Sequence, residues 1–213
     1  MKKLILVGLD RDGTINVDNG YFGKEDDWKR KLVIYNNVAE GIRLLKSDPR
    51  FKVIVATNQA GVARGFYGVE RIEEVNREID RRLRLDGAVI DSWQYCPFVD
   101  EEYARKRDLA EDNPWIKNTD MRKPGIGMLR KATEEMGLRL EDFADIYFLG
   151  NTTGDVKTGL NANGKGILIL NGENEDKCIL INIMRKKPEY KERAFIANNL
   201  LSAAQIIMEK TRR

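Results

Sequence analysis

The sequence predicts an α/β fold of three layers, in which a doubly wound, mainly parallel sheet lies between helices on both faces. Two observations support this class. Short apolar runs rich in branched residues recur along the chain, and such runs are typical of strands buried on both faces. Amphipathic segments with helical spacing alternate with these runs, which indicates parallel strands joined by helical crossovers. The length of 213 residues suits one domain, expected to span residues 1–213.

The strands are expected where the apolar runs occur. Each run is too short for a buried helix, and polar or glycine-containing segments bound it. The expected strands are Leu4–Leu9, Phe51–Ala56, Val89–Tyr95, Ile146–Leu149, Ile167–Leu170, Cys178–Met184 and Phe195–Ala197.

The expected helices begin and end at residues that favour helix termini. Asn37 and Glu40 form a capping box before the first helix, and Pro49 follows its end because proline cannot continue a helix. The segment Val69–Leu85 is expected as a surface helix, since its apolar residues share one face and glutamate–arginine pairs at i,i+4 lie on another. The remaining helices are expected from Arg122–Gly125 to Gly137, up to Asn163–Gly164, and after Asn199.

Three segments fall outside this alternation. The polar loop 16–33 carries Tyr21, Phe22 and Trp28, which either stack on a substrate or pack locally. Residues 98–120 form a charged loop insertion, and such a long irregular connection is either functional or flexible. Residues 171–194 form an irregular extension. Because no segment is long enough for a large cap domain, the fold is expected to have a minimal cap or none, with an open site.

The composition excludes several kinds of active site. The chain contains no histidine, so a Ser-His-Asp triad, a Cys-His pair and a histidine metal site are impossible. Acid–base chemistry near neutral pH then falls to carboxylates, lysines or tyrosines. Cys96 and Cys178 have neither metal-site nor disulfide spacing, so they are expected as buried free thiols in a reducing compartment.

The same survey limits the partners and the location. A formal charge of +3 is too small to indicate a nucleic acid partner, and permits only a weak preference for anionic substrates. The first apolar run ends at Asp10 without a cleavage site, and no other apolar stretch is long enough to span a membrane. A cytoplasmic protein without membrane contact is therefore expected, and its oligomeric state is left open.

Four polar clusters fall at the carboxyl ends of predicted strands or just before a helix. They are Asp10 with Asp12, Thr57 with Asn58, Lys123, and Asn151 with Asp155. Taken alone, an Asp-Gly turn is as often a solvated loop. In a doubly wound sheet, however, the carboxyl ends of the strands meet at one edge, where ligands bind. Carboxylates, a hydroxyl and an ammonium gathered there fit Mg²⁺ and a phosphate, because Mg²⁺ binds few carboxylates together with other oxygens.

The four clusters also resemble the motifs of a known family. The Asp-x-Asp-Gly-Thr sequence at 10–14, the strand-end Thr57, Lys123 and the turn 150–155 resemble the haloacid dehalogenase-type phosphatases. The segments 10–16, 57–65 and 122–124 resemble more closely the subgroup that contains heptose-bisphosphate phosphatases, histidinol-phosphatases and polynucleotide 3′-phosphatase domains. The resemblance spans about residues 3–170, and it implies a Rossmann-like fold.

The resemblance implies a role for each cluster. Asp10 would be the nucleophile that forms an aspartyl-phosphate, and Asp12 the general acid and base. Thr57 and Lys123 would hold the phosphoryl oxygens during transfer. Mg²⁺ would be held by Asp10, Asp12, Asn151 and Asp155. Substrate contacts would come from Asn58, Arg64 and Arg122.

The sequence departs from the family at two places. Asn151 stands where these phosphatases usually have an aspartate, so the metal turn has one negative charge fewer and metal affinity should fall. Heptose-phosphatase relatives often carry a zinc loop of Cys-x-His and Cys-x-Cys. The corresponding positions here are Cys96, Phe98, Thr119 and Met121. One thiol cannot form a tetrahedral zinc site, so no zinc is expected, and the loop must be ordered by packing or be mobile.

These observations predict a Mg²⁺-dependent phosphatase that hydrolyses a small phosphomonoester, a sugar phosphate or similar metabolite, with a heptose bisphosphate among the candidates. Two alternatives stay open. One is a polynucleotide 3′-phosphatase, because an open site admits a nucleic acid end. The other is a catalytically weakened phosphate-binding or regulatory protein, which the Asn151 substitution alone supports.

Overall fold

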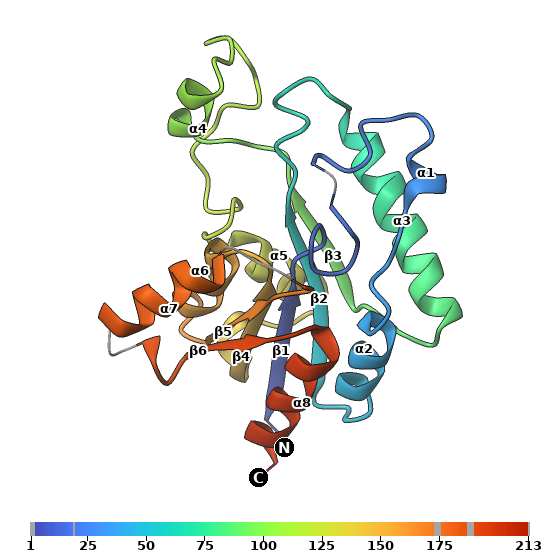
Figure 1. Ribbon diagram of the computed structural model, residues 1–213, viewed down its shortest axis with the longest axis vertical. Helices are drawn as coiled ribbons and strands as arrows, with labels where there is room; N and C mark the ends of the chain where they lie inside the picture. Colours follow the sequence, from blue (N-terminus) through green and yellow to red (C-terminus); the bar gives the residue numbers. More distant parts are fainter. Residues whose placement is uncertain (1–2, 19, 173–175, 187–189, 213) are drawn as a thin grey trace.

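A single parallel sheet of six strands forms the centre of the protein (Figure 1). The computed structural model describes residues 3–18, 20–172, 176–186 and 190–212. The strand order is β3-β2-β1-β4-β5-β6, and every neighbouring pair is parallel. The strands are β1 (Leu4–Leu9), β2 (Phe51–Asn58), β3 (Ser92–Cys96), β4 (Phe143–Gly150), β5 (Lys165–Ile169) and β6 (Ala194–Ala197).

The central strand β1 lies between β2 and β4, where the direction of winding reverses. Val7 pairs with Val53 of β2 on one side and with Tyr147 of β4 on the other. In such sheets the crevice outside the carboxyl end of the strand at the reversal binds the ligand. The residues that follow β1, starting with Asp10, therefore occupy the favoured position for chemistry.

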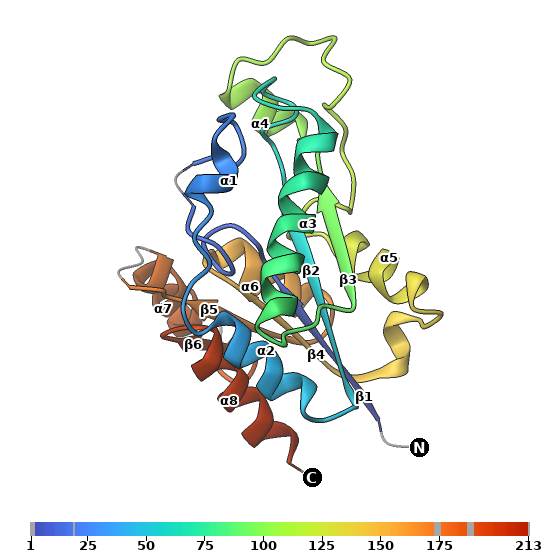
Figure 2. The ribbon, with the colours of Figure 1, turned by 90° about the vertical axis from the view of Figure 1, so that its right-hand side faces the viewer.

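Helices cover both faces of the sheet, as side-chain alternation along buried strands requires. One face, which includes Val7 and Val55, packs against α2, α3 and α8; the three helices follow one another along it (Figure 2). The other face, which includes Leu6 and Phe148, packs against α5. The helices are α1 (Trp28–Lys31), α2 (Val38–Lys46), α3 (Val69–Leu85), α4 (Glu101–Lys106), α5 (Gly127–Glu135), α6 (Thr153–Asn161), α7 (Asp176–Lys186) and α8 (Leu200–Thr211), with a 3₁₀ turn at Leu140–Asp142.

The predicted three-layer parallel fold is confirmed, with corrections to individual elements. Cys178–Met184, expected as a strand, lies within helix α7, and Cys178 is exposed instead of buried. A short apolar run fits a strand or a helix equally well by its spacing, and β6 already pairs with the edge of β5. Asn37 does occupy the N-cap of α2, but its side chain makes no capping hydrogen bond.

The two loops near the carboxyl edge are ordered by side-chain packing. In the loop 16–33, the buried rings of Phe22 and Trp28 meet edge to face, with centroids 6.4 Å apart, so these two aromatics pack locally. In the loop 98–120, the amide of Asn113 donates to the Ala63 carbonyl at 2.7 Å. The rings of Phe98 and Trp115 lie 5.6 Å apart in the same loop. Packing thus orders this loop, and the expectation that it binds no zinc stays a prediction.

The extension expected at 171–194 is described only in part. Residues 173–175 and 187–189 lie outside the described residues, and α7 occupies most of the rest. Within the described part of the chain, none of the helices combines the length and the apolar character needed to cross a membrane.

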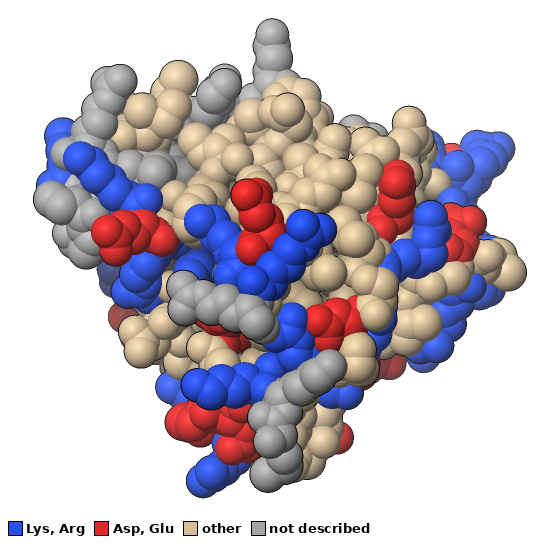
Figure 3. Space-filling view, turned by 90° about the horizontal axis from the view of Figure 1, so that it is seen from below, with Lys and Arg blue, Asp and Glu red and all other residues tan. Residues whose placement is uncertain are grey.

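The amino-terminal ends of the strands lie on the side of the sheet opposite Asp10. The surface there carries charges of both signs (Figure 3). A groove of about 790 Å³ there is lined by Lys3, Arg50, Lys165 and Lys210 together with Asp48 and Asp145. Arg50 pairs with Asp48 at 2.7 Å, and Lys165 pairs with Asp145. Because carboxylates are interspersed among the cations, this groove does not present a field of one sign.

Candidate active site

A cavity of about 320 Å³ opens at the carboxyl ends of β1, β2 and β4. Members of all four predicted clusters line it, so the structure brings together side chains that are far apart in the sequence. Its lining residues are Asp10, Asp12, Asp18, Gly20, Tyr21, Thr57, Asn58, Gln59, Ala60, Tyr67, Lys123, Asn151, Thr152, Gly154 and Asp155.

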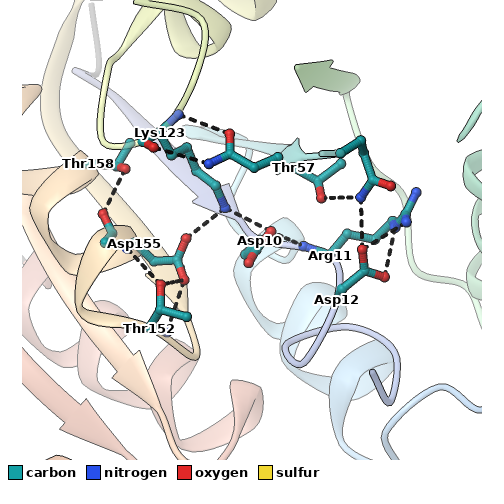
Figure 4. A network of polar contacts seen from close by, with 11 residues as sticks. Asp10, Arg11, Asp12, Thr57, Lys123, Thr152, Asp155 and Thr158 are labelled. Atoms are coloured by element: carbon teal, nitrogen blue, oxygen red, sulfur yellow. Dashed lines mark hydrogen bonds and ion pairs between the residues drawn. The ribbon is translucent and has the colours of Figure 1, made fainter. Parts of the chain in front are cut away.

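Lys123, which lines this cavity, lies between two carboxylates (Figure 4). Its Nζ is 2.8 Å from Asp10 Oδ1 and 2.6 Å from Asp155 Oδ1. The ammonium is almost fully buried, with 4% of its side chain exposed. A buried ammonium needs partners of this kind, because an unpaired charge away from water is very costly.

Burial and charge set the protonation of this pair. Burial alone would lower the pKa of Lys123, but the adjacent charges and hydrogen bonds of Asp10 and Asp155 outweigh it and raise the pKa above its usual range. Burial raises the pKa of Asp10, and the neighbouring Asp155 and Asp12 carboxylates add to the rise while Lys123 opposes it. The ammonium is therefore charged at neutral pH.

Asp12 points into a network of donors beside the pocket (Figure 4). Arg11 donates to both of its oxygens, from Nε at 3.1 Å and from a terminal nitrogen at 2.8 Å. Asn16 donates to Oδ1 at 3.0 Å, and Gln59 donates to Oδ2 at 2.8 Å. Burial disfavours the charged form, but the Arg11 charge and these hydrogen bonds outweigh it and hold the pKa of Asp12 below its usual range.

Thr57 and Asn58 end β2 beside Asp10. The Thr57 hydroxyl is buried and accepts a hydrogen bond from Gln59 at 2.8 Å. The amide of Asn58, predicted as a substrate contact, holds the backbone of Lys123. It accepts from the Lys123 N–H at 3.0 Å and donates to its carbonyl at 3.1 Å. Asn58 thereby fixes the segment that carries the ammonium.

Asp155 is oriented by the start of helix α6. Thr152 is the N-cap, and its hydroxyl accepts from the Asp155 N–H at 3.3 Å. In return, Asp155 Oδ2 accepts from the Thr152 hydroxyl at 2.7 Å and from its N–H at 3.0 Å. This capping box leaves Oδ1 directed at Lys123.

Asn151 packs directly against the turn that follows Asp12. A Cβ built on Gly13 would lie 2.3 Å from the Asn151 amide nitrogen, and Gly13 has a φ of +78°. Only glycine satisfies both conditions, because it has no Cβ and readily adopts positive φ. The oxygen-rich turn and the Asp-x-Asp loop therefore approach as closely as the sequence pattern predicts.

Arg64 and Arg122, the other predicted substrate contacts, lie beyond the cavity lining. Arg64 donates to the Tyr21 hydroxyl at 2.7 Å, and its guanidinium stacks on the rings of Tyr21 and Phe66 at 4.9 and 4.8 Å. Arg122 donates to the Phe98 carbonyl at 3.2 Å. Of Arg64, Arg122 and the aromatic residues that they contact, Tyr21 lines the cavity. Arg64 is therefore connected to the cavity by its contact with Tyr21.

The donor set fits a single Mg²⁺ ion. In the part of the chain that the structure describes, no three His, Cys, Asp or Glu side chains gather as a ready ligand set. Two carboxylates, Asp10 and Asp155, lie on either side of Lys123, and Asn151, whose amide oxygen is buried, lines the same cavity. Mg²⁺ characteristically binds one or two carboxylates and completes its shell with other oxygens and water.

The charge of the cavity also calls for a cation. Four aspartates line it, and Lys123 is the one cation among the described lining residues; the buried Arg11 pairs with Asp12 without lining the cavity. A phosphate dianion would be repelled by this surface unless a positive ion entered with it. The acidic lining thus distinguishes this cavity from a site that binds phosphate through lysine and arginine side chains alone.

Several residues of the site were not predicted from the sequence. The Thr152–Asp155 capping box has a recognisable Thr-x-x-Asp pattern and could have been predicted. Arg11 is fully buried and donates to Asn76 of α3 at 2.8 Å, which its position between two aspartates does not indicate. Gln59 and Tyr67 belong to the lining only because of their tertiary contacts.

Comparisons with known proteins agree with this geometry. The family model of polynucleotide kinase 3 phosphatase matches residues 6–177. The chain belongs to this family of haloacid dehalogenase-like phosphatases. The predicted family and enzyme class, a phosphoric monoester hydrolase, are thereby confirmed.

Among curated relatives, the D-glycero-beta-D-manno-heptose-1,7-bisphosphate 7-phosphatase of Haemophilus ducreyi is 30% identical over 82% of this chain and 91% of its own length. That of Pseudomonas putida is 31% identical over 82% and 86%. A solved structure of D,D-heptose 1,7-bisphosphate phosphatase from B. bronchiseptica, complexed with magnesium and phosphate, has a TM-score of 0.70 and 22% identity, covering 98% of this chain and 100% of its own. At that identity the structural likeness shows the shared fold.

Proposed function

We propose that this phosphatase is Mg²⁺-dependent and hydrolyses a small phosphorylated metabolite through an aspartyl-phosphate on Asp10. The observation that carries the proposal is the placement of Lys123 between Asp10 and Asp155 at the end of β1, with contacts of 2.8 and 2.6 Å. A buried cation beside a carboxylate at this edge suits a nucleophile that must meet an anionic phosphate.

In the first step an oxygen of Asp10 attacks the phosphorus and the bond to the leaving oxygen breaks. Lys123 and the Thr57 hydroxyl stabilise the phosphoryl oxygens as their charge shifts. Asp12 acts as the acid in its protonated form, which it reaches by taking up a proton from water and releasing part of the donor network that favours its charged form; it then passes that proton to the leaving oxygen.

In the second step Asp12, now a carboxylate, accepts a proton from water. The water oxygen attacks phosphorus, and the bond between phosphorus and the Asp10 oxygen breaks. Phosphate is released and Asp10 is restored. The same residue serves as acid and then as base, so no histidine is needed.

Mg²⁺ would be held by Asp10, the Asp12 backbone carbonyl, Asn151 and Asp155. When bound, it screens the negative charge of Asp10 from that of the phosphate. The acidic lining of the cavity supports this requirement, and the relative crystallised with magnesium and phosphate is consistent with it.

We take the substrate to be a small phosphomonoester such as a sugar phosphate, with heptose bisphosphates as the first candidates because the curated relatives are named for them. Arg64, Tyr21 and Arg122 would contact the part of the substrate away from the reacting phosphate. The cytoplasm remains the expected location.

A polynucleotide 3′-phosphatase is the second candidate, and the description of the matching family model favours it. The acidic lining favours the small metabolite, since a nucleic acid strand needs several cations along its backbone. Activity toward an oligonucleotide that falls steeply with salt, and exceeds activity toward sugar phosphates, would reverse this order.

The test is phosphate release from p-nitrophenyl phosphate and a panel of sugar phosphates, with Mg²⁺ or with EDTA. We expect turnover that requires Mg²⁺ and is lost in Asp10→Asn. Asp145→Asn makes the same chemical change at the opposite edge of the sheet and serves as the control. Wild type and Asp10→Asn that are equally inert would support a phosphate-binding or regulatory protein instead.

A further inference from the structure

Gln59 connects the predicted acid–base residue with the predicted phosphate-holding hydroxyl. It follows β2 directly and is 2% exposed. Its amide nitrogen donates to Asp12 Oδ2 and to Thr57 Oγ1, both at 2.8 Å. An amide nitrogen has two hydrogens, so both are used, one on each partner.

Tyr67 determines which way this amide faces. The Tyr67 hydroxyl donates to Gln59 Oε1 at 3.0 Å, so the oxygen is turned to Tyr67 and the nitrogen to Asp12. The ring reaches this position over Gly61, where a Cβ would lie 2.3 Å from Tyr67 Cζ. The close contact between Gly61 and the Tyr67 ring therefore keeps the Tyr67 hydroxyl where it holds Gln59 in one orientation.

The other donors to Asp12 cannot replace Gln59. Arg11 and Asn16 belong to the same loop as Asp12 and hold the carboxylate relative to that loop. Gln59 lies on a different segment, which follows Thr57 on β2. Among these donors it is the one that fixes Asp12 relative to the hydroxyl that would hold the phosphate.

We propose that Gln59 is a positioning residue for Asp12, and that Tyr67 orients Gln59 for this task. The inference rests on the proposed function, in which Asp12 protonates the leaving oxygen. A misplaced Asp12 harms reactions whose leaving group needs that proton. The same misplacement slows less a reaction whose leaving group departs easily as an anion.

The test compares kcat/KM for p-nitrophenyl phosphate and for a sugar phosphate in Tyr67→Phe and Gln59→Met. The ratio kcat/KM reports the steps up to the covalent intermediate, so the second step does not enter. General acids contribute roughly 10²–10⁴-fold, so we expect Gln59→Met to lower kcat/KM for the sugar phosphate by about 10²-fold and Tyr67→Phe by about tenfold. Both should lower it by less than about threefold for p-nitrophenyl phosphate.

Tyr95→Phe is the matched control, because it removes the same atom from a tyrosine whose hydroxyl donates to Glu73 at 2.9 Å, outside the cavity. It should leave both substrates unchanged. Equal losses for both substrates, or no loss, would overturn the positioning role. If Gln59→Met fails to fold, Tyr67→Phe alone decides. A wild type that hydrolyses neither substrate would overturn the proposed function and this inference with it.

Discussion

Replacing Lys123 by methionine tests the electrostatics of the site most sharply. Methionine preserves the unbranched stem that lies over Phe148, where the Lys123 nitrogen is 5.0 Å from the ring centroid. The change removes the ammonium that lies between Asp10 and Asp155, and both carboxylates then face each other without a cation. Breaking a buried ion pair by removing one partner costs about 3–5 kcal/mol of unfolding free energy.

The assay is urea unfolding with EDTA and with saturating Mg²⁺. We expect Lys123→Met to lose about 3–5 kcal/mol in EDTA. A ligand at about 100 times its dissociation constant stabilises by about 2.7 kcal/mol, and Mg²⁺ should stabilise the variant more than wild type because the carboxylates are unpaired.

Lys165→Met is the control for that experiment. Lys165 also pairs with an aspartate, Asp145, but lies at the opposite edge of the sheet with 27% of its side chain exposed, against 4% for Lys123. Exposed pairs of this kind contribute about 0–1 kcal/mol. A loss in Lys123→Met no larger than in Lys165→Met would refute the buried arrangement.

Three further outcomes follow from other contacts in the structure. Asn151→Asp adds a charge to the metal turn, so the Mg²⁺ concentration for half-maximal activity should fall about tenfold or more; an unchanged requirement would remove Asn151 from the metal site. Gly13→Ala forces a side chain at φ +78° into the Asn151 amide and should lower the urea midpoint measurably, at a cost of more than about 1 kcal/mol. The hydrogen bond from Arg81, helped by that from Arg82, lowers the pKa of Glu78 from 4.5 to about 2, although burial opposes the shift. Since the folded pKa lies below the unfolded one, its contribution is present above pH 4.5 and disappears as the pH falls toward 2, so Glu78→Gln should cost about 1 kcal/mol in urea unfolding at neutral pH and nothing at the acid end.

The sheet and the centre of the site could be predicted because both follow from strand ends. Apolar runs locate strands, and parallel connection places their carboxyl ends at one edge. That rule alone brings Asp10, Thr57 and Asp155 to one cavity. The side chain of Lys123 also reaches that cavity, as expected for a residue placed just before a helix.

The rest depends on side-chain orientation, which the residue pattern does not encode. Asn58, predicted to contact substrate, does line the cavity, but the pattern did not indicate that its amide also holds the Lys123 backbone. Gln59 and Tyr67 owe their places to a tertiary contact over Gly61 that spacing does not reveal. The strand expected at Cys178–Met184 lies in helix α7, and Ala194–Ala197 pairs with β5 instead.

Acid-quenched turnover of a phosphate-labelled substrate tests the central claim directly. We expect the label on the peptide that contains Asp10, in wild type and more strongly in Asp12→Asn, because the missing base slows hydrolysis of the intermediate. No label should appear in Asp10→Asn. Label on another residue, or phosphate release by Asp10→Asn at the wild-type rate, would contradict the account.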